Sequence, residues 1–400
     1  MVTRQSARSL WIYAFGNGVS RFGGQFQFIA LSTLTYALTG SALATAVQMA
    51  ITGLPFILLA RWTGIPADRF DPRRVVTVAS LVQALLTLGY LLSDHLAWIV
   101  TLNFLVASAT AFLIPARRAL VPQMVGKEYL LKANARLASI SGVVELTSPI
   151  VAGYLVARTA PSTAFLFNAA SFLVPALAMY LVDLAEPVRV KAAATASAFQ
   201  STAAFLRRSR GMTALLAAYG GYMLGMWSVN AIFFPYTFDV LKGDSNVVGW
   251  SISAYFGAYS LTGFVLERWG ERMRHSRWLF GAFLAGAVVW VGYAFTSSIP
   301  IAILLSAFDG IVYTYATTLF ETRVQEEAPP ESRGRIFGVI RGYDELSTVT
   351  GQLMGGALAT YTGVLPGIRL SAGLTVGIVA LVLAFTGYRT RRRAAESLSD

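Results

Sequence analysis

The chain of 400 residues has no cysteine and only two histidines, His95 and His275. The absence of cysteine excludes a disulfide scaffold, a thiol nucleophile, an iron–sulfur cluster and a cysteine zinc site. Two histidines leave little for a histidine metal centre or a Ser-His-Asp triad. No Gly-x-x-x-x-Gly-Lys-Ser/Thr loop is present either, so ATP is not expected to be used directly. We therefore expect no metal, no cofactor and no catalytic residues.

Charge is also scarce. Charged residues make up 13% of the chain, about half the share in an ordinary soluble domain. Hydrophobic residues make up 55% and the mean hydropathy is +0.58. So few charges cannot cover a soluble surface, and the hydrophobicity excludes intrinsic disorder. What remains is an all-α, polytopic membrane protein.

Long apolar runs recur along the whole chain, and a spanning helix needs about 20 such residues. We predict twelve spans and expect the first to be retained, because no cleavage-type boundary follows it. The predicted spans are 10–37, 42–62, 75–93, 96–115, 138–157, 162–183, 212–238, 247–267, 278–297, 299–320, 336–361 and 365–387.

The net charge of +12 is distributed unevenly. A basic balance can indicate nucleic-acid binding, but here the basic residues cluster before the first span and after every second span. The opposite loops carry only Arg158, Lys242 and Arg369. This is the positive-inside bias, so both termini are expected in the cytoplasm and no nucleic acid is expected as a partner.

One long polar connection divides the chain into two halves. We predict a six-helix bundle over 1–184, a cytoplasmic linker over 185–211 and a second bundle over 212–400. Within the linker, Phe199, Ala203 and Leu206 have the spacing of an amphipathic helix on the membrane surface. A solvated linker helix without a regulatory role is the alternative.

A short motif follows span 2 and recurs after span 8. Its first copy contains Gly64, Asp68, Arg69, Arg73 and Arg74, and the second, 199 positions later, contains Gly263, Glu267 and Arg268. A repeat of six spans is typical of secondary transporters, whose substrate site lies between the repeats near the bilayer midplane.

The chemistry of the first copy suits a gate. Gly64 permits close approach of another helix. Asp68 can cap an adjacent helix or pair with arginine across the interface, and such charged links can form in one conformation and break in another. The alternative is a solvated positive-inside loop; two copies at half-chain spacing favour the gate.

This arrangement resembles the major facilitator superfamily. The segment 64–74 is similar to its signature between helices 2 and 3, G-x-x-x-D-R-x-G-R-R, except at Asp71 and Pro72. The resemblance implies twelve helices in two pseudo-symmetric six-helix bundles, a small-molecule substrate, alternating access and a monomer within the lipid bilayer.

A narrower resemblance is to the bacterial branch of macrolide-efflux and enterobactin-exporter-like proteins. It rests on the segments 115–122, 130–134 and 331–335, and it implies efflux across the bacterial inner membrane. In span 5, Pro149 and Gly153 are similar to the G-P-x-x-G-G antiporter motif, with Ser148 and Ala152 in place of two glycines. Physically, Pro149 and its small neighbours would kink this helix and permit close packing.

Ionisable residues at membrane depth are costly and indicate function. Arg21 either forms a structural ion pair with an acid on a facing helix, or contacts an anionic substrate group or tunes a proton site. Glu145, Asp309 and Asp344 are candidates for proton coupling. Asp344, with Glu345 beside it, has the alternative of pairing with Arg341 or Arg136 at the cytoplasmic mouth.

In the superfamily, helices 1, 4, 7 and 10 line the substrate cavity. The resemblance therefore implies a cavity lined by Asn17, Arg21, Gln25, Asn103, Asn230 and Tyr313, with Asp309 on one of the same helices. Many aromatic and few charged residues favour large, amphipathic substrates over sugars.

The leading hypothesis is proton-coupled efflux of drugs or amphipathic secondary metabolites. Within the same fold, the alternatives are a flippase for lysophospholipids or similar lipids and an uptake symporter. An intramembrane enzyme is a more remote alternative, because it needs a constellation that two histidines do not supply. A channel is disfavoured by the two-fold repeat with its cytoplasmic linker.

Overall fold

A computed structural model describes residues 4–126, 129–184, 209–269, 276–329 and 333–396, and this part of the chain is helical without strands. The predicted amphipathic helix at Phe199, Ala203 and Leu206 lies outside it. The first half contains α1 (Arg4–Thr39), α2 (Ala42–Ala50), α3 (Leu54–Leu58), α4 (Gly64–Arg69), α5 (Pro72–Leu88), the 3-10 turn η1 (Gly89–Leu91), α6 (Leu96–Val125), α7 (Leu130–Arg158) and α8 (Pro161–Ala178).

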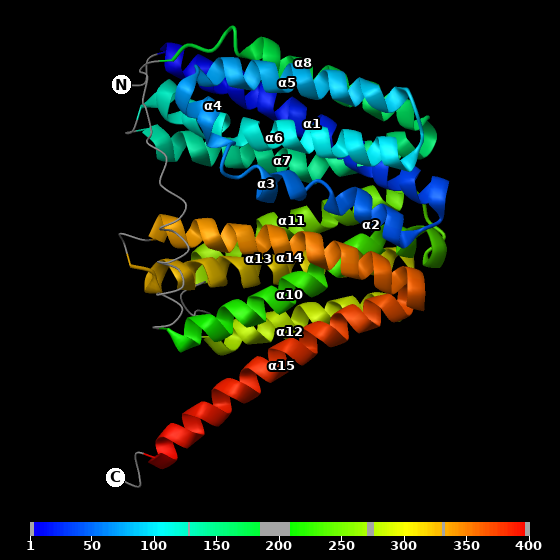
Figure 1. Ribbon diagram of the computed structural model, residues 1–400, viewed down its shortest axis with the longest axis vertical. Coiled ribbons are helices and arrows are strands. Elements are labelled where there is room, and N and C mark those ends of the chain that lie inside the picture. The colour runs from blue at the N-terminus through cyan, green and yellow to red at the C-terminus, as the bar shows by residue number, and fades with distance from the viewer. Residues whose placement is uncertain (1–3, 127–128, 185–208, 270–275, 330–332, 397–400) are drawn as a thin grey trace.

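The second half has the same plan. It contains α10 (Arg210–Pro235), the π-turn η3 (Tyr236–Val240), α11 (Ser245–Trp269), α12 (Ser276–Tyr293), α13 (Ile299–Glu327), α14 (Arg333–Thr362) and α15 (Val364–Glu396). The two bundles lie side by side, and both chain termini lie at one end, here called the terminal end (Figure 1). The other end is called the far end.

The helices are suited to a membrane. Six of them, α6, α7, α8, α13, α5 continued by η1, and the first part of α15, are long and apolar enough to cross a bilayer by length and composition. The α2–α3 pair and α12 are shorter apolar segments, while α1, α10, α11 and α14 each contribute polar residues to the cavity described below. The predicted fold, an all-α membrane protein of two six-helix bundles, is confirmed.

The second span departs from the prediction of one continuous helix over 42–62. The helix breaks after Ala50, because Pro55 has no N–H to continue the ladder. Instead, the N–H groups of Thr52 and Gly53 bond three residues back, to Met49 and Ala50, at 3.1 Å each. The prediction of an unbroken span was wrong, and three short helices take its place and that of the following loop.

The two bundles converge toward the far end. On α7, a methyl group at Gly153 would meet the carbonyl oxygen of Ser245 and lie 3.0 Å from Cα of Gly249, both on α11. Nearer the terminal end of α7, a methyl group at Gly142 would meet only Oγ of Ser260, at 3.9 Å. The α7–α11 pair is therefore in backbone contact at the far end and separates toward the terminal end.

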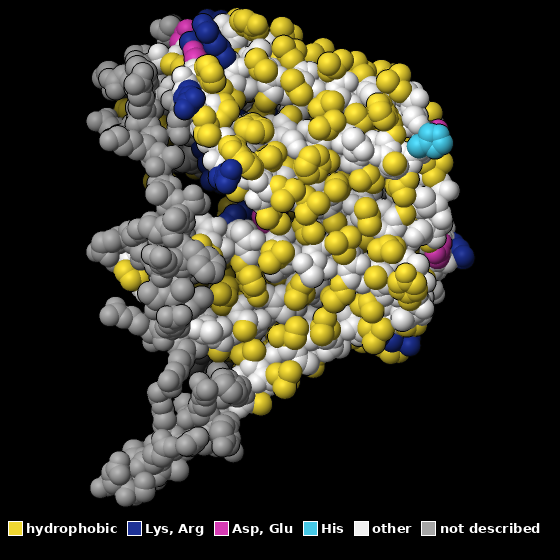
Figure 2. All heavy atoms as spheres, in the orientation of Figure 1, with side chains coloured by type: hydrophobic (Ala, Val, Ile, Leu, Met, Phe, Trp, Pro, Cys, Tyr) yellow, Lys and Arg dark blue, Asp and Glu magenta, His cyan; other side chains and the backbone are white. Residues whose placement is uncertain are grey.

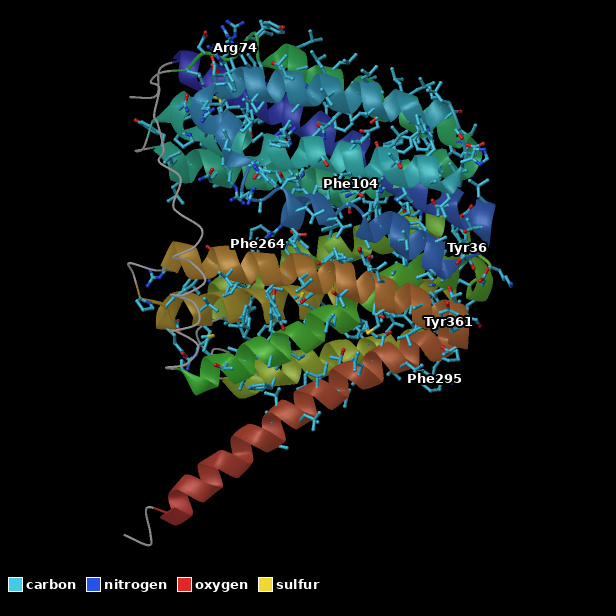
Figure 3. The ribbon with its side chains drawn as sticks, in the orientation of Figure 1. Tyr36, Arg74, Phe104, Phe264, Phe295 and Tyr361 are labelled. Carbon is cyan, nitrogen blue, oxygen red and sulfur yellow. The ribbon has the colours of Figure 1, made fainter. Side chains whose placement is uncertain are left out.

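Polar and aromatic contacts also join the halves at the far end. The Tyr36 hydroxyl donates to Asp239, and the Tyr36 ring stacks on Phe238 with centroids 5.8 Å apart. The backbone N–H of Leu43 donates to Oγ1 of Thr360 at 3.0 Å. Figure 3 places Tyr36 at this end and Arg74 at the other. The far end is thus closed.

Candidate functional site: a cavity between the two halves

A cavity of about 740 Å³ lies between the bundles, lined by side chains from both. Figure 2 shows the surface indented between the halves on the terminal side, with Lys and Arg side chains beside the indentation. Because the far end is closed, the terminal end is the side from which a solute reaches this cavity. Its size suits a drug-sized molecule.

The first half supplies a polar wall. Its polar lining residues are Ser20, Arg21, Gln25, Gln27, Gln48, Thr52, Gln83, Asn103, Thr110, Arg117, Glu145 and Asn168. Arg21 on α1 forms an ion pair with Glu145 on α7, so these two charges neutralise each other. Arg117 on α6 has no hydrogen-bond or ion-pair partner among the described side chains, although it lines the same cavity.

Hydrogen bonds between helices hold the amides of this wall. Asn168 on α8 donates to Gln27 on α1. The Asn103 amide donates to the carbonyl oxygen of Gln48 at 2.7 Å, and the Gln83 amide donates to Thr110 at 2.8 Å. Polar groups in a bilayer need internal partners, and these bonds fix the amides on the wall.

The second half supplies an aromatic wall with one carboxyl group. Tyr313 on α13 packs with Tyr255 and Tyr259 of α11, with ring centroids 5.9 and 6.2 Å apart. Asp309, one turn before Tyr313, accepts a hydrogen bond from the indole N–H of Trp290 at 3.0 Å. Within the described residues no arginine or lysine forms an ion pair with Asp309. Ionising it at membrane depth is therefore unfavourable.

Most of the predicted cavity and coupling residues lie together in this lining: Arg21, Gln25, Asn103, Glu145, Asn230, Asp309 and Tyr313. Asn17 and Asp344 lie outside it, and each has a buried oxygen, Oδ1, without a hydrogen-bond partner among the described residues. Glu345, rather than Asp344, pairs with Arg341, at 3.2 Å.

Arg117 is a lining residue that sequence reasoning missed. It was placed in a loop, because the fourth span was predicted to end at residue 115, whereas α6 continues to Val125. Asn103, Thr110 and Arg117 follow one another at intervals of seven residues, which is two helical turns, so they share one face. That periodicity was the available signal.

The departures of the first motif from its family pattern have a local cause. Asp71 caps α5 by accepting from the backbone N–H of Arg73 at 2.8 Å, and Pro72 occupies the first helical position, where no N–H is needed. The Arg73 guanidinium also bonds the Asp71 carboxylate and the carbonyl oxygen of Val182, at 2.8 and 3.1 Å. This hydrogen-bonded pair lowers the pKa of Asp71.

The other described residues of the two motif copies are loosely packed or exposed in this conformation. A methyl group at Gly64 or Gly263 would meet nothing within 4 Å, so the close approach expected at Gly64 is not made here. The side chains of Arg69, Arg74, Glu267 and Arg268 are exposed, and the side chain of Asp68 lies outside the described part. By contrast, Pro149 and Gly153 of the helix-5 motif take part in the far-end contact with α11.

Two six-helix bundles around a central cavity, closed at one end, define a membrane transporter rather than an enzyme. In the described residues, no cluster of His, Asp and Glu suits a metal ion. The family model described as "Transmembrane secretion effector", a branch of the major facilitator superfamily, matches residues 2–399. The chain belongs to this family, as its sequence motifs predicted.

Similar proteins agree with this assignment. Macrolide efflux protein A of Streptococcus pyogenes is 23% identical over 373 residues, covering 91% of this chain and 92% of that protein. The multidrug efflux pump Tap of Mycolicibacterium fortuitum is 24% identical, covering 92% of each. A bacterial homologue of the human lysosomal transporter Spinster, in an inward-facing and occupied conformation, superposes with a TM-score of 0.77 at 12% identity, over 98% of both chains. That likeness shows the fold.

Proposed function

We propose that this protein is a proton-coupled exporter of amphipathic compounds, in a bacterial inner membrane, that works by alternating access as a monomer. The observation that carries the proposal is the cavity between the halves, with its polar wall and its aromatic wall. Among the described residues it has one lining carboxyl group without a cationic partner, Asp309. The efflux proteins named above support the direction of transport.

The sidedness of the cavity fits export. The positive-inside distribution supports a cytoplasmic location of the terminal end, and with that orientation the conformation described here is inward-facing. A substrate then enters from the cytoplasm or the inner leaflet, and the far-end contacts must break to release it. In this proposal the basic residues serve as membrane-topology signals, so no nucleic-acid partner is needed to explain them.

Asp309 is the proposed proton carrier. A neutral carboxyl group is compatible with the aromatic wall, whereas the ionised form needs hydrogen-bond donors, which polar groups on the body of a substrate can supply. Proton binding and substrate binding then compete at one wall, which is the requirement for antiport. Glu145 has its charge matched by Arg21 and in this scheme takes part when that pair opens.

The test uses the purified full chain in liposomes that contain a pH-sensitive dye. An imposed proton gradient with an amphipathic drug panel should give substrate-dependent proton movement. Asp309→Asn should abolish that proton movement, and Asn230→Ala, a neutral change in the same cavity, should retain it with altered affinity. Substrate flux without proton movement in the wild-type protein would refute the coupling, and flux of labelled lysolipids alone would support the flippase alternative.

A further inference from the structure

The cavity contains a cation without a described counter-charge. Arg117 lines the cavity, and no described side chain makes a hydrogen bond or an ion pair with it. The second cavity arginine, Arg21, is neutralised by Glu145. Arg117 is half-buried, and a partly desolvated cation without a counter-charge is unfavourable, so Arg117 is suited to an anion that arrives with a ligand.

Other polar atoms of the lining also lack partners. Oε1 of Gln83 and Oγ of Ser251 are buried without a hydrogen bond among the described residues, and both residues line the cavity. Buried polar atoms are nearly always bonded, so the wall around the cavity has unused hydrogen-bonding capacity in this conformation. Thr110, the partner of Gln83, lies two turns, about 10 Å, from Arg117 along α6.

The facing wall selects for the rest of the molecule. Trp227, Phe233 and Phe256 line the cavity from the second half and supply aromatic surface for an apolar body. Asp309 belongs to this wall and, when ionised, repels an anion. An amphipathic acid is therefore oriented with its anionic group on the Arg117 side and its apolar part on the aromatic side.

We propose that the cavity binds amphipathic organic acids, whose carboxylate pairs with Arg117 while the apolar body packs on the aromatic wall. A guanidinium suits this role because it binds a carboxylate through two parallel hydrogen bonds. The proposal rests on the proposed function and specifies its substrate class.

The test compares two fluorescent probes with one body, dansyl-leucine, a carboxylate, and dansyl-leucinamide, which is neutral. Binding to the full chain in nanodiscs is measured by energy transfer from tryptophan, since Trp227 lines the cavity. We expect the acid to bind about tenfold more tightly than the amide, which is about 1.4 kcal/mol. Uptake of each probe into everted vesicles gives its flux.

The variants separate the charge from the fold. Arg117→Gln should bring the acid to the affinity of the amide and leave amide binding unchanged, and Arg117→Lys should retain part of the preference. Arg118→Gln is the matched control, because Arg118 is the adjacent arginine but is exposed and outside the lining. It should bind both probes as the wild-type protein does.

Each outcome decides one claim. Equal affinity for the two probes, absence of binding by the acid, or an equal loss of both in Arg117→Gln would overturn the proposal. If the amide alone is bound and moved, the exporter stands and the acid class is wrong. If the acid binds through Arg117 but shows no flux, the binding proposal stands and the exporter function is refuted.

Discussion

Replacing Gly153 by alanine should open the far end. The three nearest atoms to the new methyl group are all backbone atoms of α11, including Cα of Gly249 at 3.0 Å and its nitrogen at 3.2 Å. Because backbone cannot rotate away, α7 and α11 must separate by roughly 0.5–1 Å to restore ordinary contact. Overpacking of this kind costs about 1–3 kcal/mol, and a conformation with the far end open avoids it. The ratio of far-end-open to far-end-closed molecules should therefore rise by about 5- to 140-fold.

The assay exploits the absence of cysteine. Single cysteines at Thr159 and Lys242, exposed positions of the two halves at the far end, accept spin labels without background. Pulsed electron paramagnetic resonance should show a longer distance between the two spin labels in Gly153→Ala than in the otherwise unchanged protein. Gly142→Ala is the control on the same helix, since its methyl group meets only a side-chain oxygen at 3.9 Å. An unchanged distance distribution in Gly153→Ala, in a folded protein, would refute the reasoning.

Four further predictions concern charges and the gate. Glu145→Gln leaves Arg21 without its partner and should lower the melting temperature in detergent, whereas adding Arg21→Gln should restore most of it; an additive double variant would argue against direct pairing. Asp71→Asn should cost about 1 kcal/mol or less at pH 7. The pKa of Asp71 is lowered in the folded protein, so its stabilisation is present above about pH 4 and is lost as the pH falls through that lowered pKa. The melting temperature of Asp71→Asn should therefore lack this part of the decrease at acid pH. Tyr36→Phe removes the hydrogen bond to Asp239 and should raise the far-end-open fraction in the spin-label assay by a few-fold. An unchanged fraction would argue against a role of this bond in keeping the far end closed. Asp68→Asn should impair transport in vesicles while insertion stays normal, and full flux would exclude the gating role.

The architecture was predictable because its signals are long and repeated. Apolar runs, the distribution of basic residues and the copy of the Gly64 motif at Gly263 each extend over many residues, so no single position decides them. The break in the second span was harder. Leu54 and Pro55 lie in a uniformly apolar segment, and hydropathy does not distinguish a broken apolar helix from a continuous one.

The site was predictable only in part, because membership in a helix is easier to infer than its face and its end. Asp309 and Tyr313 lie on a helix that the resemblance implied to line the cavity, and both residues line it. Asn17, on another of the expected helices, does not. Arg117 was missed for a physical reason: an arginine after an apolar run has the same sequence signature whether it marks the cytoplasmic border or lies inside the last turns of a helix that borders a hydrated cavity.

The contact of Gly153 with Gly249 gives α7 the geometry of a lever. The fulcrum lies close to the far end, and Leu130, the first residue of the helix, lies 23 residues away, an arm of about 35 Å at 1.5 Å per residue. A tilt of about 10° about the two glycines moves that end by roughly 6 Å, while the fulcrum itself scarcely moves. The width of the opening at the terminal end therefore depends on the tilt angle of α7 and on the length of helix between Gly153 and Leu130. A bulkier residue at position 153 changes the angle, and a shorter helix changes the length.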